Sequence, residues 1–208
     1  MAMFPKFFIT VFLSFVSVVA VASDGTPLEN LYSGLSGSCT EIRYSFIFTV
    51  NGMKHVGEGE LCLQGQSYVL RGNGLEIFSN GKDVWVADVC AKEMTISTVE
   101  DLSYGSVSDP VLLLSSMNEI FRVAGQTAGT DGATVIYEML PLKDCGVDKA
   151  VLEIRKKDAI LTKAGFSIDG NMMEITIDSM KHLPLKDASV FFPSFDYSDS
   201  SWIVSDIR

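Results

Sequence analysis

Cysteine and histidine are the residue types in this sequence with the most distinctive chemistry. The four cysteines are Cys39, Cys62, Cys90 and Cys145. In an oxidising compartment an even number permits one or two disulfides, and four cysteines allow three full pairings. No CxxC spacing occurs, and a zinc site would also need nearby histidines, of which the sequence has only His55 and His182. We therefore expect structural disulfides or buried thiols and no metal ligands.

Motifs for covalent catalysis are also missing. The sequence has no G-x-S-x-G, no H-E-x-x-H, no Walker loop and no calcium loop of the D-x-[DN]-x-[DN]-G form. His55 follows a turn and His182 lies near the end of an expected strand, which is typical of solvated histidines. We predict that the protein is not an enzyme and uses no cofactor; a secreted hydrolase is the weakest alternative.

The first 22 residues have the pattern of an export signal. Lys6 supplies a positive charge, residues 7–21 are apolar, and Ala20-Val21-Ala22 is a small-x-small cleavage site. A membrane anchor would need about 20 spanning residues and usually a charged stop, whereas this segment is shorter. We predict cleavage after Ala22 and a soluble periplasmic chain. Residues 23–208 contain no linker, charge block or repeat, so a single domain is expected.

The expected mature chain is strongly acidic. The sequence has 16 Lys and Arg against 26 Asp and Glu, and removal of Lys6 leaves 15 against 26, a net charge of −11. Such a surface repels nucleic acid backbones and anionic lipid headgroups. A basic protein partner remains possible, and outward-facing Glu58 and Glu60 are candidates for steering it.

Turn signals organise the sequence into hairpins. Asn-Gly or Asp-Gly pairs occur at 51–52, 73–74, 80–81, 131–132 and 169–170. We predict strands near 40–50, 56–64, 67–72, 74–79, 82–89, 93–98, 120–124, 133–140, 149–156, 159–167, 172–183 and 189–192. About a dozen strands in this order indicate a mainly β, antiparallel meander.

Alternation gives this sheet one apolar face. Ile42, Tyr44, Phe46, Phe48 and Val50 share one face, and Leu61 and Leu63 continue it on the next strand, which turns Cys62 outward. To bury this face, the sheet must curl into a barrel, pack against a second sheet or be covered by helices.

Only two short helices are available as cover. Thr26 and Pro27 open a helix over 27–35 that carries Leu28 and Leu31, and Asp109-Pro110 opens a second that is apolar nearly all round. Two such helices cannot fill a dozen-stranded barrel, which favours an internal cavity, although an ordinary packed core remains the alternative.

The sequence resembles the LolA family of periplasmic outer-membrane lipoprotein carriers, most closely its Bacteroidetes-like branch. Gly57-Glu58-Gly59-Glu60-Leu61 matches the family's G-x-G-x-L strand, NGKDVWVAD its DGK-x-x-W-x-Y hairpin, and SDPVLLL its x-P-x-x-L-L helix. YEMLPLK matches an L-x-P-K strand end, and the C-terminal VFFPSFDYSDSSWIVSDIR matches an F-x-F…V-x-D-x-R ending. Gly65-Gln66 stands where better-known members have the arginine-proline linked to lid closure, so that latch is not carried over.

The resemblance implies an unclosed antiparallel β-barrel of about 11–12 strands with a helical lid, whose apolar cavity holds the acyl chains of lipoproteins. It implies acylated lipoproteins, an ATP-driven (ABC-type) inner-membrane exporter and an outer-membrane acceptor as partners of a monomer. A periplasmic lipid or lipoprotein sensor with the same half-barrel is the alternative. The predicted cavity residues are Phe46, Phe48, Leu61, Leu63, Tyr68, Ile77, Trp85, Ile96, Leu113 and Met117. The predicted lid residues are Leu28, Leu31, Pro110, Leu112 and Leu113.

Overall fold

A single twelve-stranded sheet forms the protein in a computed structural model that describes residues 25–100 and 117–208. The predicted export signal and the start of the predicted second helix at Pro110 lie outside the described residues. The helices are α1 (Pro27–Gly37), α3 (Met117–Ile120) and the 3-10 helix η1 (Ala188–Phe191). The strands are β1 (Cys39–Val50), β2 (Met53–Gln64), β3 (Ser67–Gly72), β4 (Leu75–Asn80), β5 (Asp83–Asp88), β6 (Glu93–Thr98), β7 (Phe121–Ala128), β8 (Thr134–Pro141), β9 (Lys149–Arg155), β10 (Ile160–Ile168), β11 (Asn171–Leu183) and β12 (Ile203–Asp206).

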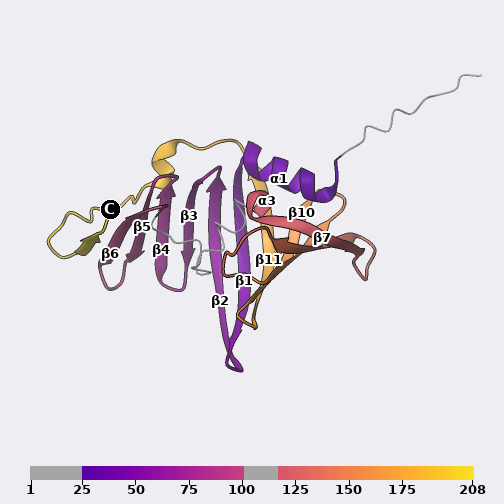
Figure 1. Cartoon of the computed structure of the whole chain (residues 1–208). Helices are drawn as coiled ribbons and strands as arrows, with labels where there is room; N and C mark the ends of the chain where they lie inside the picture. The colour runs from indigo at the N-terminus through magenta and orange to yellow at the C-terminus, as the bar shows by residue number, and fades with distance from the viewer. Residues whose placement is uncertain (1–24, 101–116) are drawn as a thin grey trace, which may run out of the picture.

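The strand order shows how the sheet is assembled. It runs β12-β6-β5-β4-β3-β2-β1-β11-β10-β9-β8-β7, so two hairpin meanders meet where β1 pairs with β11 (Figure 1). Every pairing is antiparallel except that of β12 with β6, which is parallel. Strands β12 and β7 end the order without pairing to each other, so the sheet is unclosed. The predicted fold class, a mainly β unclosed half-barrel with short helices, is confirmed.

Local turn chemistry explains the strand boundaries. At Asn51-Gly52, Asn73-Gly74 and Asp169-Gly170 both residues have positive φ, the conformation that a tight hairpin requires. At the β4–β5 turn the Asn80 side-chain oxygen accepts hydrogen bonds from the backbone N–H groups of Lys82 and Asp83, at 2.9 and 2.8 Å. These residues therefore end each strand where the sequence places a turn.

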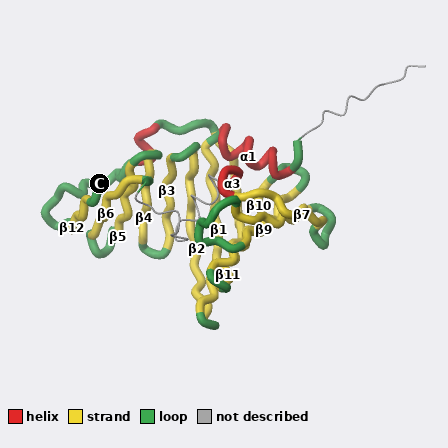
Figure 2. Tube along the Cα trace, in the orientation of Figure 1, coloured by secondary structure: helices red, strands yellow, loops and turns green. Residues whose placement is uncertain are grey.

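Helix α1 begins as its sequence predicts. The Thr26 hydroxyl accepts a hydrogen bond from the Glu29 backbone N–H at 3.2 Å, and the Glu29 carboxylate accepts one from the Thr26 N–H at 2.7 Å, which completes a capping box. The helix buries Leu28, Leu31 and Leu35. It contacts β1, β2 and also β9, which are separated in the strand order, so the sheet curls around it (Figures 1 and 2). The face that carries α1 is therefore called the concave face.

Two predictions at the C-terminal end are wrong in detail. Residues 189–192 were expected to form a strand, but residues 188–191 form η1, because the Asp187 carboxylate accepts a hydrogen bond from the Ser189 N–H at 2.9 Å and caps a helical turn. Strand β12, which the sequence analysis missed, has four exposed residues and no alternation of burial. Its pairing with β6 comes from tertiary contact, which local patterning does not indicate.

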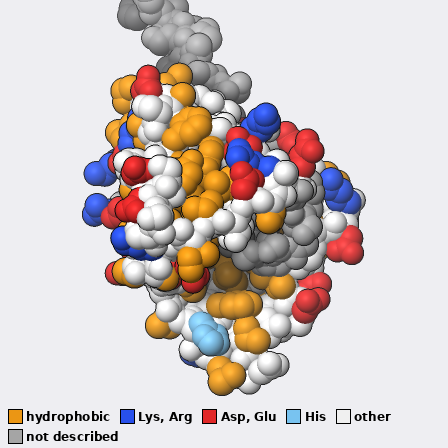
Figure 3. All heavy atoms as spheres, turned by 90° about the vertical axis from the view of Figure 1, so that its left-hand side faces the viewer, with side chains coloured by type: hydrophobic (Ala, Val, Ile, Leu, Met, Phe, Trp, Pro, Cys, Tyr) orange, Lys and Arg blue, Asp and Glu red, His pale blue; other side chains and the backbone are white. Residues whose placement is uncertain are grey.

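Two separate hydrophobic clusters lie on the two faces of the sheet. The larger cluster includes α1 and the inward residues of β1–β3 and β8–β11, on the concave face. The smaller cluster lies on the opposite, convex face of β3–β6, where η1 and residues 195–202 cover it. Seen from the β12 side, hydrophobic side chains form a band between charged margins (Figure 3).

Candidate lipid-binding site

An apolar row crosses the concave face from β1 to β4. Ile42 lies opposite Leu61, Leu61 opposite Leu70, and Leu70 opposite Ile77. Directly opposed residues of neighbouring strands share a face, so these side chains point to the same side of the sheet. Leu70 and Ile77 are only partly buried, although they pack against the larger cluster. The row therefore runs from a closed core into space that is not fully packed.

A cavity of about 180 Å³ lies at this end of the row. Its lining is mostly apolar side chains and is completed by Gly72, Asn73 and Glu58. Glu58 stands between the inward Gly57 and Gly59, so its side chain belongs to the convex side of β2. The apolar lining residues are Tyr44, Phe46, Leu70, Leu75, Ile77, Met173 and Ile175. They come from β1, β3, β4 and β11, so the site depends on the junction of the two meanders. A concave space with apolar walls and a few polar groups at its margin is typical of a ligand site.

Two glycines of β2 make room for the aromatic side chains in this lining. A Cβ atom added to Gly57 would lie 2.6 Å from the ring of Phe46, and one added to Gly59 would lie 2.6 Å from the hydroxyl of Tyr44. Both rings therefore approach the β2 backbone so closely that a Cβ atom at either position would force the ring to move. The two glycines of the G-x-G-x-L pattern thus shape the cavity wall directly.

Most of the predicted cavity residues lie on or near this face. Leu61, Leu63, Tyr68 and Met117 are buried in the larger cluster, and Phe46, Phe48 and Ile77 pack against it. Of these, Phe46 and Ile77 line the cavity. The predicted lid residues Leu28 and Leu31 are buried on α1 within the same cluster. Leu113, Pro110 and Leu112 lie outside the described residues.

Trp85 and Ile96 are on the other face, which corrects their predicted placement in the cavity. Trp85 lies opposite Phe78 and Ile96 lies opposite Trp85, and all three belong to the convex cluster. Ile77 precedes Phe78 in β4 and therefore points to the concave side. The sequence did not resolve this because β4 and β5 carry apolar residues on both faces, so alternation alone gave no preferred side.

Residues 191–202 close the convex face. Phe191 is buried, the rings of Phe195 and Trp202 stack with centroids 5.0 Å apart, and Phe195 meets Phe78 edge-on at 6.0 Å. The Phe192 ring lies 5.3 Å from that of Trp85. The aromatic residues of the C-terminal segment therefore fill the side of the sheet opposite the cavity.

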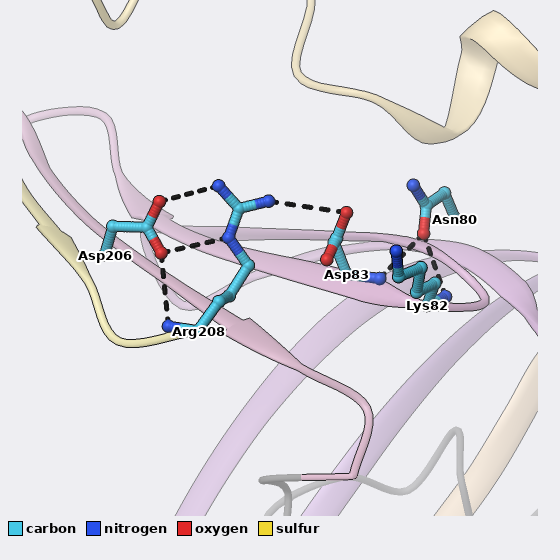
Figure 4. Close-up of polar contacts among 5 residues, drawn as sticks. All are labelled: Asn80, Lys82, Asp83, Asp206 and Arg208. Carbon is cyan, nitrogen blue, oxygen red and sulfur yellow. Dashed lines mark hydrogen bonds and ion pairs between the residues drawn. The ribbon is translucent and has the colours of Figure 1, made fainter.

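Ion pairs fix the end of this segment to the sheet. Arg208 binds Asp206 at 2.6 Å and also reaches Asp83 of β5 at 3.4 Å (Figure 4). The guanidinium of Arg208 holds the pKa of Asp206 at about 2. The V-x-D-x-R ending recognised in the sequence thus corresponds to an anchoring contact for β12.

The residues that sequence reasoning missed at the cavity are Leu70, Leu75 and Met173. Tyr44 and Ile175 were identified as parts of alternating strands but were not assigned to the cavity. Leu70 could have been found from the tight turn between β3 and β4, because its register places Leu70 opposite Ile77. Met173 could not have been found from local sequence, because it reaches the site only through its long-range pairing with Phe48.

Helix α1 brings one buried polar group to this face. The Tyr32 hydroxyl of α1 is buried and has no hydrogen-bond partner within the described part of the chain, and burial raises the pKa of Tyr32 to about 12.

No group of three or more His, Cys, Asp or Glu side chains that could hold a metal ion occurs among residues 25–100 and 117–208. Over the same residues, no helix is long and apolar enough to cross a bilayer.

The fold and cavity together define a class: a half-barrel β-protein with an apolar space on its concave side. Several solved structures are similar to this chain at low sequence identity. A LolA superfamily protein from Nitrosomonas europaea is 10% identical with a TM-score of 0.46, and the match covers 81% of this chain and 98% of that one. A putative outer-membrane lipoprotein-sorting protein domain from Vibrio parahaemolyticus is 10% identical with a TM-score of 0.44, over 78% and 96% of the two chains.

The Mycobacterium tuberculosis lipoprotein LppX is 12% identical with a TM-score of 0.39, over 77% of this chain and 95% of that one. No protein-family model and no curated protein matches the sequence.

Proposed function

We propose that this protein is a periplasmic carrier that binds the acyl chains of lipoproteins on its concave face and takes them from the inner to the outer membrane. The observation that carries the proposal is the cavity lined by Phe46, Leu70, Ile77, Met173 and Ile175. Each CH₂ group moved from water to such a surface gains about 0.8 kcal/mol, so an acylated protein needs an apolar shelter to cross an aqueous space. The role requires binding and release, and no covalent step.

Several side chains that border the cavity are only partly buried by the core. It lies at the junction of β1 with β11, where β1 carries a register shift between Arg43 and Tyr44, and its walls include the partly buried Leu70, Ile77 and Met173. Partly buried apolar side chains on an unclosed sheet can separate around a ligand at lower cost than a filled core. This supports a reversible carrier of flexible chains.

Ligand binding tests the cavity directly. We expect purified protein to bind a fatty acid or an apolar dye, and the variant Ile77→Asp to bind it at least about tenfold more weakly, because a carboxylate would replace a wall of the cavity. Val89→Asp is the matched control, since Val89 is 40% exposed and follows β5 away from the cavity. Equal binding by wild type and Ile77→Asp would exclude this cavity as the ligand site.

Release of lipoprotein from inner-membrane vesicles tests the transport role. We expect the mature chain to release acylated lipoprotein when the exporter is supplied with ATP, and Ile77→Asp to fail while remaining folded. Mass spectrometry of lipid or lipoprotein bound to protein purified from its native compartment would identify the cargo. Binding of fatty acid without release would support ligand binding and contradict the carrier role.

Docking on the exporter is proposed to use the acidic convex side of β2. Glu58 and Glu60 are exposed there, and Glu60 pairs with Arg43 at 2.9 Å. Attraction to a basic surface would act over about 8 Å at physiological salt, so association should slow as salt is added. The double variant Glu58→Lys with Glu60→Lys should associate more slowly in surface-plasmon measurements. An association rate that changes neither with salt nor in the double variant would mean that Glu58 and Glu60 contribute to solubility alone.

A further inference from the structure

Two of the four cysteines lie side by side in neighbouring strands. The Sγ atoms of Cys39, the first residue of β1, and Cys62 of β2 are 3.2 Å apart. In the β1–β2 register Cys62 lies opposite Glu41, so Cys39 is its diagonal neighbour on the convex side of the sheet. A disulfide bond is about 2.05 Å long, and small rotations of the two side chains would close the remaining distance.

The two thiols have different access to reagents. Cys39 is fully buried, with an exposed fraction of 0%. Cys62 is partly exposed and lines a surface pocket of about 180 Å³ together with Glu41 and Lys186. Lys186 is fixed there, because its ammonium group lies 2.6 Å from the Glu41 carboxylate and its backbone N–H donates to the Gln64 side chain at 2.8 Å.

This arrangement determines which sulfur would react first. Cys62 lines the surface pocket and is partly exposed, so an external disulfide can reach its sulfur, whereas the buried Cys39 is out of reach. The thiolate is the nucleophile in thiol–disulfide exchange. Burial and the neighbouring Cys62 raise the pKa of Cys39 to about 12, so Cys39 stays protonated until Cys62 has reacted. Cys62 is therefore placed to attack an external disulfide, and Cys39 to complete the bond from within the protein.

We propose that Cys39 and Cys62 form an intramolecular disulfide that is made by exchange with a small-molecule or protein disulfide. The Cys62 thiolate attacks the external disulfide, forms a mixed disulfide and releases one thiolate of the oxidant. The Cys39 sulfur then attacks Cys62 Sγ, and its proton passes to the second sulfur of the oxidant, which leaves as a thiol. The protein loses two hydrogen atoms, and the external disulfide is reduced to two thiols.

The other two cysteines remain thiols under this assignment. Cys90 is exposed in the turn between β5 and β6, whereas Cys145 is buried between β8 and β9 in the larger cluster. These positions belong to different meanders and to different hydrophobic surroundings. The assignment therefore differs from all three pairings in which the four cysteines form two disulfides. It has one disulfide, between Cys39 and Cys62, and two free thiols, Cys90 and Cys145.

The test uses the mature chain, folded and incubated in a buffer of glutathione disulfide and glutathione. Alkylation in denaturant followed by digestion and mass spectrometry should show the peptides of Cys39 and Cys62 joined, with Cys90 and Cys145 alkylated. Intact protein should be lighter by two hydrogen atoms. The double variant Cys90→Ser with Cys145→Ser is the matched control and should form the same bond.

Two results would overturn the assignment. One is full alkylation of Cys39 and Cys62 after incubation in oxidising buffer; the other is linkage of Cys62 to Cys90 or to a second chain. In Cys39→Ser the partly exposed Cys62 should accumulate as a mixed disulfide with glutathione, whereas in Cys62→Ser the buried Cys39 should stay unmodified. Equal glutathione labelling of the two single variants would contradict the order of attack.

Discussion

The concave and convex faces of the sheet are both apolar, but they are completed in different ways. On the convex side of β3–β6, Phe191, Phe195 and Trp202 from the C-terminal segment fill the surface that Phe78 and Trp85 present. On the concave side, Leu70 and Ile77 border a cavity of about 180 Å³. Ile77 and Phe78 are neighbours in the sequence, yet one belongs to a candidate ligand site and the other to a packed core.

This difference shows that hydrophobicity alone does not identify a binding surface. Phe78 is 1% exposed and has aromatic partners, so its burial is compensated within the protein. Ile77 is only partly buried and has an unfilled space beside it. The informative feature is therefore an apolar side chain whose packing is incomplete, and predictions that compare the two faces test this directly.

The largest expected effect comes from the convex face. Phe78→Ala should lower the free energy of unfolding by about 3–5 kcal/mol, because it removes a buried ring and leaves a cavity. Under conditions where the variant stays folded, its affinity for fatty acid should match that of wild type, in contrast to Ile77→Asp. Urea denaturation and a binding titration on the same samples measure both quantities. Equal loss of affinity in both variants would mean that the two faces are not independent.

Reduction of the proposed disulfide is expected to have the next largest effect. Cys39 and Cys62 are separated by 23 positions, and a bond across a loop of that size stabilises a fold by about 3 kcal/mol. Oxidised wild type should therefore unfold at higher urea concentration than either reduced wild type or Cys62→Ser. Cys90→Ser should behave as wild type in both states. Ligand affinity should change little, because the cysteines lie on the convex side.

Variants that remove a helix cap allow α1, on the concave face, to be compared with η1, on the convex face. Thr26→Ala removes the cap of α1 on the concave face and should cost about 1 kcal/mol of unfolding free energy. Asp187→Ala removes the cap of η1, which has only four residues, and should cost less. Thermal unfolding of both variants measures the difference. A larger loss for Asp187→Ala would show that η1 contributes more to stability than α1.

A smaller effect is expected from His182 at low pH. Its Nδ1 lies 3.0 Å from the hydroxyl oxygens of both Ser38 and Thr40, and its ring lies against Gly34 of α1. Burial lowers the pKa of His182, so folding favours the neutral ring. Its contribution should be complete above about pH 6.5 and lost as the pH falls through the lower folded pKa. His182→Gln should therefore lose less stability than wild type between about pH 8 and about pH 5.

The smallest expected effect is on tryptophan fluorescence. Both tryptophans of the protein, Trp85 and Trp202, belong to the convex cluster. Ligand binding on the concave face should therefore leave the emission maximum unchanged, whereas Phe192→Ala should shift it by exposing Trp85. Emission spectra with and without fatty acid provide the measurement. A ligand-induced shift as large as that of Phe192→Ala would place the ligand near the convex face.

Much of the fold could be predicted because the turns are specified locally. Asn51-Gly52 and Asn73-Gly74 fixed the first strands, and alternation from Ile42 to Val50 correctly gave one apolar face. Trp85 was misplaced because β4 and β5 are apolar on both sides. The β4–β5 register supplies the missing information, because it places Trp85 opposite Phe78 and therefore on the same face. Ile77 is the neighbour of Phe78 in β4, so Ile77 and Trp85 lie on opposite faces.

The cavity itself was less predictable, since it depends on long-range pairing. Phe46 and Ile77 could be chosen from local patterns, but Met173 and Ile175 reach the site only because β11 pairs with β1. Strand β12 presented the same difficulty, because it pairs in parallel with a strand far from it in the sequence. Sequence patterns therefore found the individual strands but not the contacts that join the two meanders.

The junction of β1 with β11 also has a consequence for the kinetics of folding. The hairpins from β1 to β6 and from β7 to β11 consist of strands adjacent in sequence, so each meander can form rapidly from local contacts. Their union must wait for β11, which is made after ten other strands, and until then one edge of β1 is unpaired. The slow step of folding should therefore be closure of this long-range pair, and the cavity should be the last part of the molecule to acquire its shape.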